Sequence, residues 1–191
     1  MVVATVHESA LSDLADETLA ARAGRDFDAF AELYNRYLCR IYRFVRAQTP
    51  DESTAEDLTA QTFFKALSSA RSFRGHGSYR AWIFRIARNT IVTWRMRRER
   101  APLIVGDIPD PVDPAPTPAA AVVTGEEELL IRRLVVALPP AQREVLSLRY
   151  LEDLSTEEVA SITGRSRGAI RILLHRARAS LRSQLRDRSL T

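Results

Sequence analysis

Apolar residues recur along most of this chain three or four positions apart, the spacing of one face of an α-helix. The clearest stretch runs from about Asp28 to Ala47, where aromatic and aliphatic residues share one broad face. Similar patterns predict further helices near 13–23, 53–70, 78–98, 126–138, 141–150, 155–163 and 166–186. No segment alternates apolar and polar residues over a useful length, so the sequence predicts an all-α protein.

A proline-rich segment, 101–125, interrupts these patterns. It holds six of the nine prolines and three aspartates, and it has no basic residue. Because proline removes backbone hydrogen bonds from helices and sheets, we expect an extended, semi-rigid acidic linker. The chain is therefore predicted to form two small helical domains, residues 10–100 and 126–188, of which the second has four helices.

Residues 139–186 carry the pattern of a helix–turn–helix. Ser155 and Glu158 form a capping box at the start of one helix, and Gly164 supplies the left-handed residue that ends it. Ser166 is placed to cap the next helix. The two helices are therefore predicted to lie on either side of a tight turn.

The second helix of this pair has an apolar row and an arginine row. The apolar row, predicted to face inward, is Ile170, Leu174, Ala177 and Leu181. The outward row is Arg167, Arg171, Arg178 and Arg182. A helix–turn–helix presents its second helix to the DNA major groove, where arginine binds guanine O6 and N7 or grips phosphate. We therefore predict that this helix binds duplex DNA.

The charge is distributed unevenly, although the formal net charge is only +4. Residues 71–100 hold nine arginines against one acid, and residues 165–188 hold eight against one. Residues 51–57 hold four acids and no basic residue. This distribution indicates two nucleic-acid contacts and one protein contact.

Several classes of protein are not supported. Cys39 is the single cysteine, so no intrachain disulfide forms, and its place in an apolar helix pattern predicts a buried thiol. We expect a cytoplasmic protein, because the first ten residues do not resemble a signal peptide and no run of about 18 apolar residues occurs. No nucleotide-binding loop, nucleophile elbow or metal-ligand cluster is present, so we expect no enzymatic activity, cofactor or metal.

The helix predicted over 53–70, with Ser53 and Glu56 as a second capping box, has two contrasting faces. The predicted buried residues are Leu58, Thr62, Phe63, Ala66 and Leu67. The opposite face carries Asp57, Gln61, Phe64 and Ser68. A large aromatic side chain on a polar face is either covered by another part of the domain or anchors a partner protein. Both interpretations of Phe64 remain open.

The helix predicted over 78–98 mixes tryptophans with arginines. Its apolar stripe is Trp82, Ile83, Ile86, Ala87, Thr90 and Trp94. Outside that stripe lie Arg85, Arg88, Asn89 and Arg95, with Phe84 and Ile91 in the same row as Arg88 and Arg95. A loop with two glycines, 73–79, precedes it. Stacking aromatics and phosphate-binding arginines are typical of single-stranded DNA sites, and the alternative is a solvated basic face.

Four segments together resemble one protein family: AFAELYNRY at 29–37, AEDLTAQTFFKAL at 55–67, FRGHGSYRAWIFRIARN at 73–89, and LPPAQREVLSLRYLEDLSTEEVA at 138–160. With these motifs the chain resembles bacterial RNA polymerase sigma factors of the extracytoplasmic-function (ECF) group. The resemblance covers about residues 15–100 and 126–186.

The resemblance implies a function without chemistry: binding core RNA polymerase and directing it to promoters. The residues implied to dock on the clamp helices of the largest subunit are Asp57, Gln61 and Phe64. Those implied to open and hold the non-template strand of the −10 element are Arg74, His76, Ser78, Tyr79, Arg85, Arg88, Asn89 and Arg95. Those implied to bind the −35 element are Arg165, Ser166, Arg167, Arg171, Arg176 and Arg178. An anti-sigma protein is a further possible partner, and no membrane contact is implied.

The chain departs from the family pattern at a few positions, and two other classes of protein compete. Ala60 replaces a frequent glutamine, Gln61 an acid, and Thr93-Trp94 a pair that often begins with aspartate. A helix–turn–helix repressor or activator that is not a polymerase subunit explains 139–186 but not Phe64 or the tryptophan–arginine helix. A helical adaptor protein leaves both arginine faces unexplained.

Overall fold

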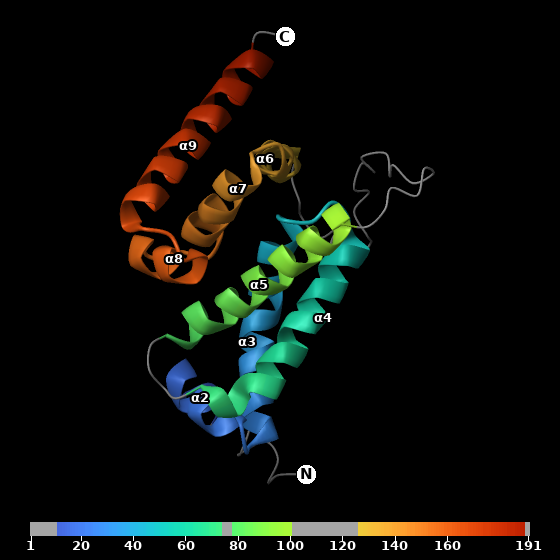
Figure 1. The fold of residues 1–191 in the computed structure, drawn as a ribbon, viewed down its shortest axis with the longest axis vertical. Helices are drawn as coiled ribbons and strands as arrows, with labels where there is room; N and C mark the ends of the chain where they lie inside the picture. The colour runs from blue at the N-terminus through green and yellow to red at the C-terminus, as the bar shows by residue number, and fades with distance from the viewer. Residues whose placement is uncertain (1–10, 74–77, 101–125, 190–191) are drawn as a thin grey trace.

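The computed structural model describes residues 11–73, 78–100 and 126–189, and this part of the chain contains helices and turns but no strand. The N-terminal elements are α2 (Asp16–Ala23), α3 (Phe27–Arg46), α4 (Glu52–Ser69), the 3₁₀ turn η1 (Ala70–Ser72) and α5 (Tyr79–Arg100). The C-terminal elements are α6 (Glu126–Val136), α7 (Pro140–Leu146), the π-helical turn η2 (Ser147–Leu151), α8 (Thr156–Thr163) and α9 (Arg167–Ser189). Figure 1 shows an elongated arrangement of helices, with α2 near one pole and the C-terminal end of α9 at the other. The prediction of an all-α fold is confirmed for the described residues.

Helix α3 forms the centre of the N-terminal part, as its pattern predicts. It begins after Asp26, whose side chain accepts hydrogen bonds from the backbone N–H groups of Asp28 and Ala29. Its buried face includes Ile41 and Phe44, both 0% exposed. Helices α2, α4 and α5 all pack against it. One amphipathic helix of 20 residues therefore organises this half of the molecule.

The helix–turn–helix forms through the local signals that the sequence contains. The Ser155 and Glu158 side chains make both hydrogen bonds of the capping box at α8. Gly164 adopts φ +68°, the left-handed conformation that ends α8. The Ser166 hydroxyl accepts a hydrogen bond from the backbone N–H of Ala169 at 3.2 Å. These features confirm the predicted turn between α8 and α9.

Two predictions for α4 are wrong. The helix begins at Glu52, and Asp51 is its cap, because the Asp51 carboxylate accepts from the backbone N–H of Thr54 at 2.7 Å. Ser53 therefore lies inside the first turn and cannot form the predicted capping box with Glu56. Leu67 is 41% exposed rather than buried, because it lies about 100° around the helix from the centre of the buried face.

The prediction of a buried Cys39 thiol is also wrong, because Cys39 is exposed. On α3 it shares a row with Asn35 and Arg43, four residues away on each side, and both are exposed. The apolar pattern of the segment continues around the helix on the face away from this row.

The two sets of helices pack on one another through a continuous core. Helix α5 lies against α8, and η2 contacts α3. Phe84 and Ile91, predicted on the outer row of α5, are 0% and 3% exposed. That row is therefore not a solvated face in this arrangement. The Phe84 ring makes an edge-to-face contact with Phe44, with ring centroids 5.5 Å apart. We call the surface where α3 and α5 meet the C-terminal helices the seam.

Some predictions fall outside the described residues. These are the linker 101–125 and the loop residues Arg74 and His76. Within the described ranges, no helix has the length and apolar character needed to cross a membrane. No cluster of metal-ligating side chains was found there either.

Candidate polymerase and nucleic-acid interfaces

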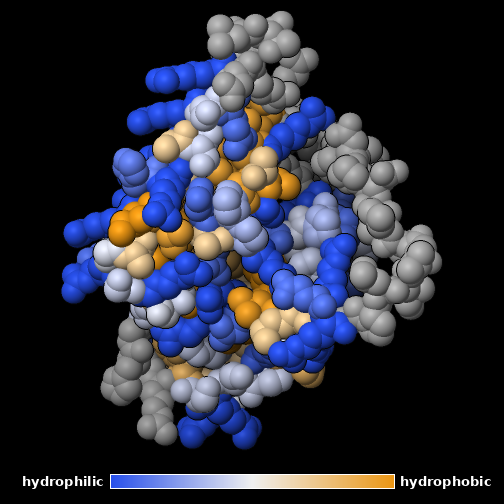
Figure 2. Space-filling view, turned by 45° about the horizontal axis from the view of Figure 1, so that its top comes forward, coloured by the Kyte–Doolittle hydropathy of each residue, from blue (hydrophilic) through white to orange (hydrophobic). Residues whose placement is uncertain are grey.

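Helix α9 presents its arginines to solvent. The apolar row that predicted its orientation is buried at Ile170, Leu174 and Ala177, while Leu181 is half-buried. The predicted DNA-contacting residues that are exposed are Ser166, Arg167, Arg171, Arg176 and Arg178. On the face of the molecule shown in Figure 2, strongly hydrophilic side chains project into solvent, and hydrophobic residues form separate patches. The orientation predicted for this helix is therefore confirmed.

Two arginines at the start of α9 are already paired within the chain. Arg167 Nη1 lies 3.2 Å from a carboxylate oxygen of Glu157, and both side chains are more than half exposed. Arg165 is half-buried, with Nη2 3.9 Å from Glu144 Oε2. The exposed Arg167–Glu157 pair contributes little stability, so Arg167 can exchange it for another anion.

The outer face of α4 is open. Phe64 is 72% exposed, so the alternative in which another described part of the domain covers its ring is wrong. Asp57 and Gln61 are exposed on the same face. An aromatic ring beside a carboxylate and an amide on a rigid helix is a typical anchor for a partner protein.

Three arginines of α5 donate hydrogen bonds to the C-terminal helices, and of these Arg85 stays exposed to solvent. Arg88 Nε donates to Glu144 Oε1 at 3.0 Å, and Arg85 Nη2 donates to Ser161 Oγ at 2.8 Å. Arg80, which the sequence analysis did not single out, donates through Nη2 to Glu158 Oε1 at 2.9 Å. The face predicted to bind single-stranded DNA is therefore partly covered by α7 and α8, which hold Arg88 and Arg85, while Asn89 stays exposed.

A buried carboxylate joins α3 to the C-terminal helices. Glu152 is 1% exposed, and Arg40 Nε donates to its Oε2 at 2.9 Å. Arg43 Nη2 lies 3.8 Å from Oε1. Burial raises the pKa of Glu152 above its ordinary value, and the two arginines oppose that shift.

Tyr79 lies inside the fold. It is 2% exposed, and its ring packs against Tyr37, Phe73 and Trp82 at centroid distances of 5.3 to 5.7 Å. Burial raises the pKa of its hydroxyl. The neighbouring Ser78 hydroxyl accepts from the backbone N–H of Ala81 at 3.4 Å. This cluster fixes the first turn of α5 and hence the end of the loop that precedes it.

The structure thus brings the predicted α5 residues together on one face, and separates them from the predicted α4 and α9 surfaces. Asn89 is exposed, whereas Arg95 is half-buried against Gln48. The seam contacts of Glu144, Glu152 and Glu158 were not predicted from the sequence. One signal was available: large apolar residues in the arginine row of α5 indicate that this row is covered.

Comparison with known proteins agrees with this layout. Residues 33–101 match the family described as sigma-70 region 2, and residues 128–181 match sigma-70, region 4. The RNA polymerase sigma factor YlaC of Bacillus subtilis is 32% identical over 163 residues, which cover 83% of this chain and 92% of YlaC. The ECF RNA polymerase sigma factor BldN of Streptomyces coelicolor is 34% identical over 169 residues, covering 87% of this chain and 64% of BldN.

The chain belongs to the ECF group of RNA polymerase sigma factors. Sigma factors are non-enzymatic subunits that direct transcription initiation. Of the three classes compatible with the sequence, the free-standing repressor and the adaptor are therefore set aside. The fold agrees, because the structure of CnrH in complex with the cytosolic domain of CnrY matches with a TM-score of 0.68 and 24% identity, over 90% of this chain and 97% of that one. RpoE from Bartonella quintana, solved with the anti-sigma factor NepR, gives the same TM-score and identity over 82% and 96%.

Proposed function

We propose that this ECF sigma factor binds core polymerase through α4, the −10 element through α5 with the loop before it, and the −35 element through α9. The observation that carries the proposal is a pair of exposed surfaces on separate elements. One is the Phe64 face of α4, and the other is the arginine row of α9. They face different partners, as a protein that bridges a polymerase and a promoter requires.

The N-terminal half of α9 enters the major groove. Arg167 and Arg171 are exposed near the start of the helix, where helix–turn–helix side chains reach base edges. Their guanidinium groups match guanine O6 and N7. Arg165 and Ser166, at the cap, belong to the same reading surface, and the phosphate contacts come from Arg176 and Arg178.

The −10 element is melted and held at α5. The residues that contact its non-template strand are those of the arginine face, Arg85, Arg88, Asn89 and Arg95, together with Arg74, His76 and Ser78 of the preceding loop. Arginines follow the phosphates, while a flipped base needs a pocket that offsets an unstacking cost of a few kcal/mol. Tyr79 acts from within the fold, because its buried ring supports the end of the loop.

Promoter binding requires the two halves to separate. The seam occupies Arg85 and Arg88 with Ser161 and Glu144, so DNA and the C-terminal helices compete for the same donors. The Arg88–Glu144 pair is largely shielded from solvent, so polymerase and DNA contacts must replace it when the halves separate. Once apart, the halves stay joined by 101–125, a segment that spans at most about 80 Å when fully extended.

Asp57, Gln61 and Phe64 dock on the clamp helices of the largest polymerase subunit. Phe64 fills an apolar pocket, while Asp57 and Gln61 make polar contacts around it. An anti-sigma protein is a second proposed partner, supported by the complex of the similarly folded RpoE with NepR.

Transcription in vitro tests the proposal. Core RNA polymerase is combined with the purified chain on fragmented genomic DNA, and transcript 5′ ends are sequenced. We expect start sites that share two upstream elements and that disappear without the chain. Start sites unchanged by adding the chain would contradict the proposal.

A further inference from the structure

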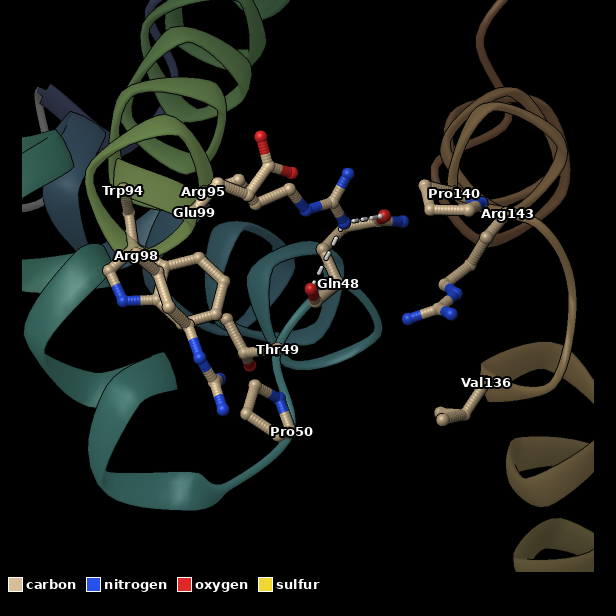
Figure 3. Close-up of a pocket in the computed structure, with 10 residues that line it drawn as sticks. All are labelled: Gln48, Thr49, Pro50, Trp94, Arg95, Arg98, Glu99, Val136, Pro140 and Arg143. Carbon is tan, nitrogen blue, oxygen red and sulfur yellow. Dashed lines mark hydrogen bonds between the residues drawn. The ribbon is translucent and has the colours of Figure 1, made fainter. Parts of the chain in front are cut away.

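A pocket of about 500 Å³ lies at one end of the seam. Trp94, Arg95 and Arg98 of α5 line one side, Gln48 lies at its base, and Arg143 of α7 comes from the C-terminal half. Figure 3 shows Arg95 and Arg143 directed toward one another across this pocket. Its volume falls within the usual range of small-molecule sites.

The charges in this pocket are not balanced as they are along the rest of the seam. Elsewhere arginines meet carboxylates, as in the pairs Arg40–Glu152 and Arg88–Glu144. Arg95 instead donates from Nη2 to the backbone oxygen and the Oε1 of Gln48, at 3.1 and 3.0 Å. These acceptors are neutral, and no carboxylate forms an ion pair with Arg95 among the described residues.

Arg143 is in the same situation. Its Nη2 donates to the backbone oxygen of Leu138 at 3.0 Å, a neutral acceptor. Its Nε is buried and has no hydrogen-bond partner within the described part of the chain. A buried donor without a partner is costly, and a half-buried charge whose direct acceptors are all neutral favours an added anion.

The electrostatics of the two side chains reflect this imbalance. Burial lowers the pKa of Arg95, and the carboxylates of Glu144 and, more weakly, of Glu99 at the rim of the pocket oppose the shift. Burial also lowers the pKa of Arg143, and repulsion from Arg95 lowers it further. Both groups stay protonated at neutral pH because guanidinium groups are strongly basic. Among the residues that line the pocket, Glu99 is the one carboxylate beside three arginines.

We propose that this pocket binds a small phosphate-bearing anion held between Arg95 and Arg143. A guanidinium group can donate two parallel hydrogen bonds to phosphate oxygens. A phosphate would therefore give Arg143 Nε an acceptor and would give both arginines a negative charge to pair with. Arg98 lies over the Trp94 ring, with its guanidinium carbon 5.7 Å from the centroid, and adds a third cation at the mouth. The indole ring offers a flat surface on which a base could stack.

The ligand has a regulatory consequence, which rests on the proposed function. Because it contacts one arginine from each half, it stabilises the closed seam by mass action. Arg95 belongs to the proposed −10 surface, so the bound anion and promoter DNA exclude one another. The pocket would make promoter binding respond to the concentration of a phosphorylated small molecule.

Thermal melting and tryptophan fluorescence of the full chain test this site, with pyrophosphate as the probe and sodium chloride at equal ionic strength as its reference. We expect pyrophosphate to raise the melting temperature and to change Trp94 emission beyond the effect of chloride. Arg143→Gln should weaken the response about tenfold or more, because a charge-assisted hydrogen bond is lost. Arg22→Gln removes the same charge from an exposed position on α2 and should leave the response unchanged.

A second variant keeps both arginines in place. Val136→Glu puts a carboxylate at the rim, where Val136 lines the pocket and is 37% exposed, and it should also abolish the response. An equal response to chloride and pyrophosphate overturns the site, as does a wild-type response in both variants. Promoter-directed initiation without pyrophosphate is scored separately, so a failed site leaves the proposed function standing.

Discussion

Phe63 and Phe64 are neighbours on α4, one buried and one exposed, so the same substitution at each separates a structural role from a binding role. Phe64 is 72% exposed and Phe63 is 4% exposed. Phe64→Ala should weaken binding to core polymerase while leaving thermal unfolding nearly unchanged. Phe63→Ala should lower the free energy of unfolding by about 3–5 kcal/mol through the cavity it leaves. Polymerase pull-down and melting curves measure both effects, and a large stability loss in Phe64→Ala would mean that its ring is structural.

Arg171 and Arg178 separate base reading from phosphate binding on α9. Both are exposed on the helix. Arg171→Ala should cost about 1–3 kcal/mol of binding and relax the preference at one −35 position, because a base-edge contact carries sequence information. Arg178→Ala should weaken binding about equally on all sequences. Selection of randomised −35 elements by the holoenzyme measures both, and a uniform loss in Arg171→Ala would make Arg171 a phosphate contact.

Glu152 predicts a distinctive pH dependence. Burial raises its pKa above the ordinary value of 4.5, so the folded protein retains this proton at pH values where the unfolded chain has lost it. The stabilisation is fully present below 4.5 and is lost as the pH rises through the folded pKa. Glu152→Gln keeps an acceptor for Arg40 and removes the titration. Urea unfolding from pH 4 to 7 should therefore show the wild type losing stability relative to the variant as pH rises, by at most about 1.4 kcal/mol per pH unit. Parallel profiles would contradict the shift.

Alanine substitutions at Gly164 and Gly168 test the turn, because the backbone is left-handed at 164 and helical at 168. Gly164 has φ +68° and nothing within 4 Å of an added Cβ, so Gly164→Ala costs only the strain of the left-handed conformation, about 1–2 kcal/mol. Gly168 lies in α9 with an ordinary contact at 3.9 Å. Gly168→Ala should therefore leave stability unchanged or raise it by up to about 1 kcal/mol. Chemical denaturation measures both, and equal effects would show that the turn is not strained by a side chain.

The helices themselves were predictable because their signals are local. The capping box at Ser155 and the glycine at 164 each act within a few residues, and both form as predicted. Ser53 was predicted to cap α4 because serine is a good capping residue and Glu56 follows three positions later, whereas Asp51 caps the helix in the structure. The predicted first residue of α4 was therefore wrong by one position, whereas the existence of the helix was predicted correctly.

Burial on the outer row of α5 was not predictable from its own sequence. Phe84 and Ile91 are buried by elements that lie far away along the chain. The prediction that Cys39 is buried was wrong for a different reason, because its apolar neighbours in sequence lie on another face of α3. Which surface of an amphipathic helix is covered depends on the whole molecule.

In the whole molecule, the C-terminal helices compete with promoter DNA for the arginines of the seam. Its cations come from α3 and α5, and its anions come from the C-terminal helices, as in the pairs of Arg80 with Glu158 and Arg88 with Glu144. Between them lies an apolar layer that includes Leu148, Leu154 and Val159, all 0% exposed. The apolar layer and the ion pairs together hold the two halves in the closed arrangement.

The closed arrangement should therefore open when its ion pairs are broken, and the chain offers a convenient place for a label. Cys39 is exposed and is the only cysteine, so Ser183→Cys on exposed α9 adds a second label on the other half. We expect energy transfer between the two dyes to fall in Glu144→Lys, because a lysine at 144 repels Arg88 and Arg165, the two partners that Glu144 holds at 3.0 and 3.9 Å. Adding Arg88→Glu should restore the transfer by reversing one pair. Glu32→Lys breaks an ion pair with Arg36 inside the N-terminal half and should leave the transfer unchanged. If Glu144→Lys and Glu32→Lys behave alike, the seam is held by its apolar layer alone and its charges do not control the opening.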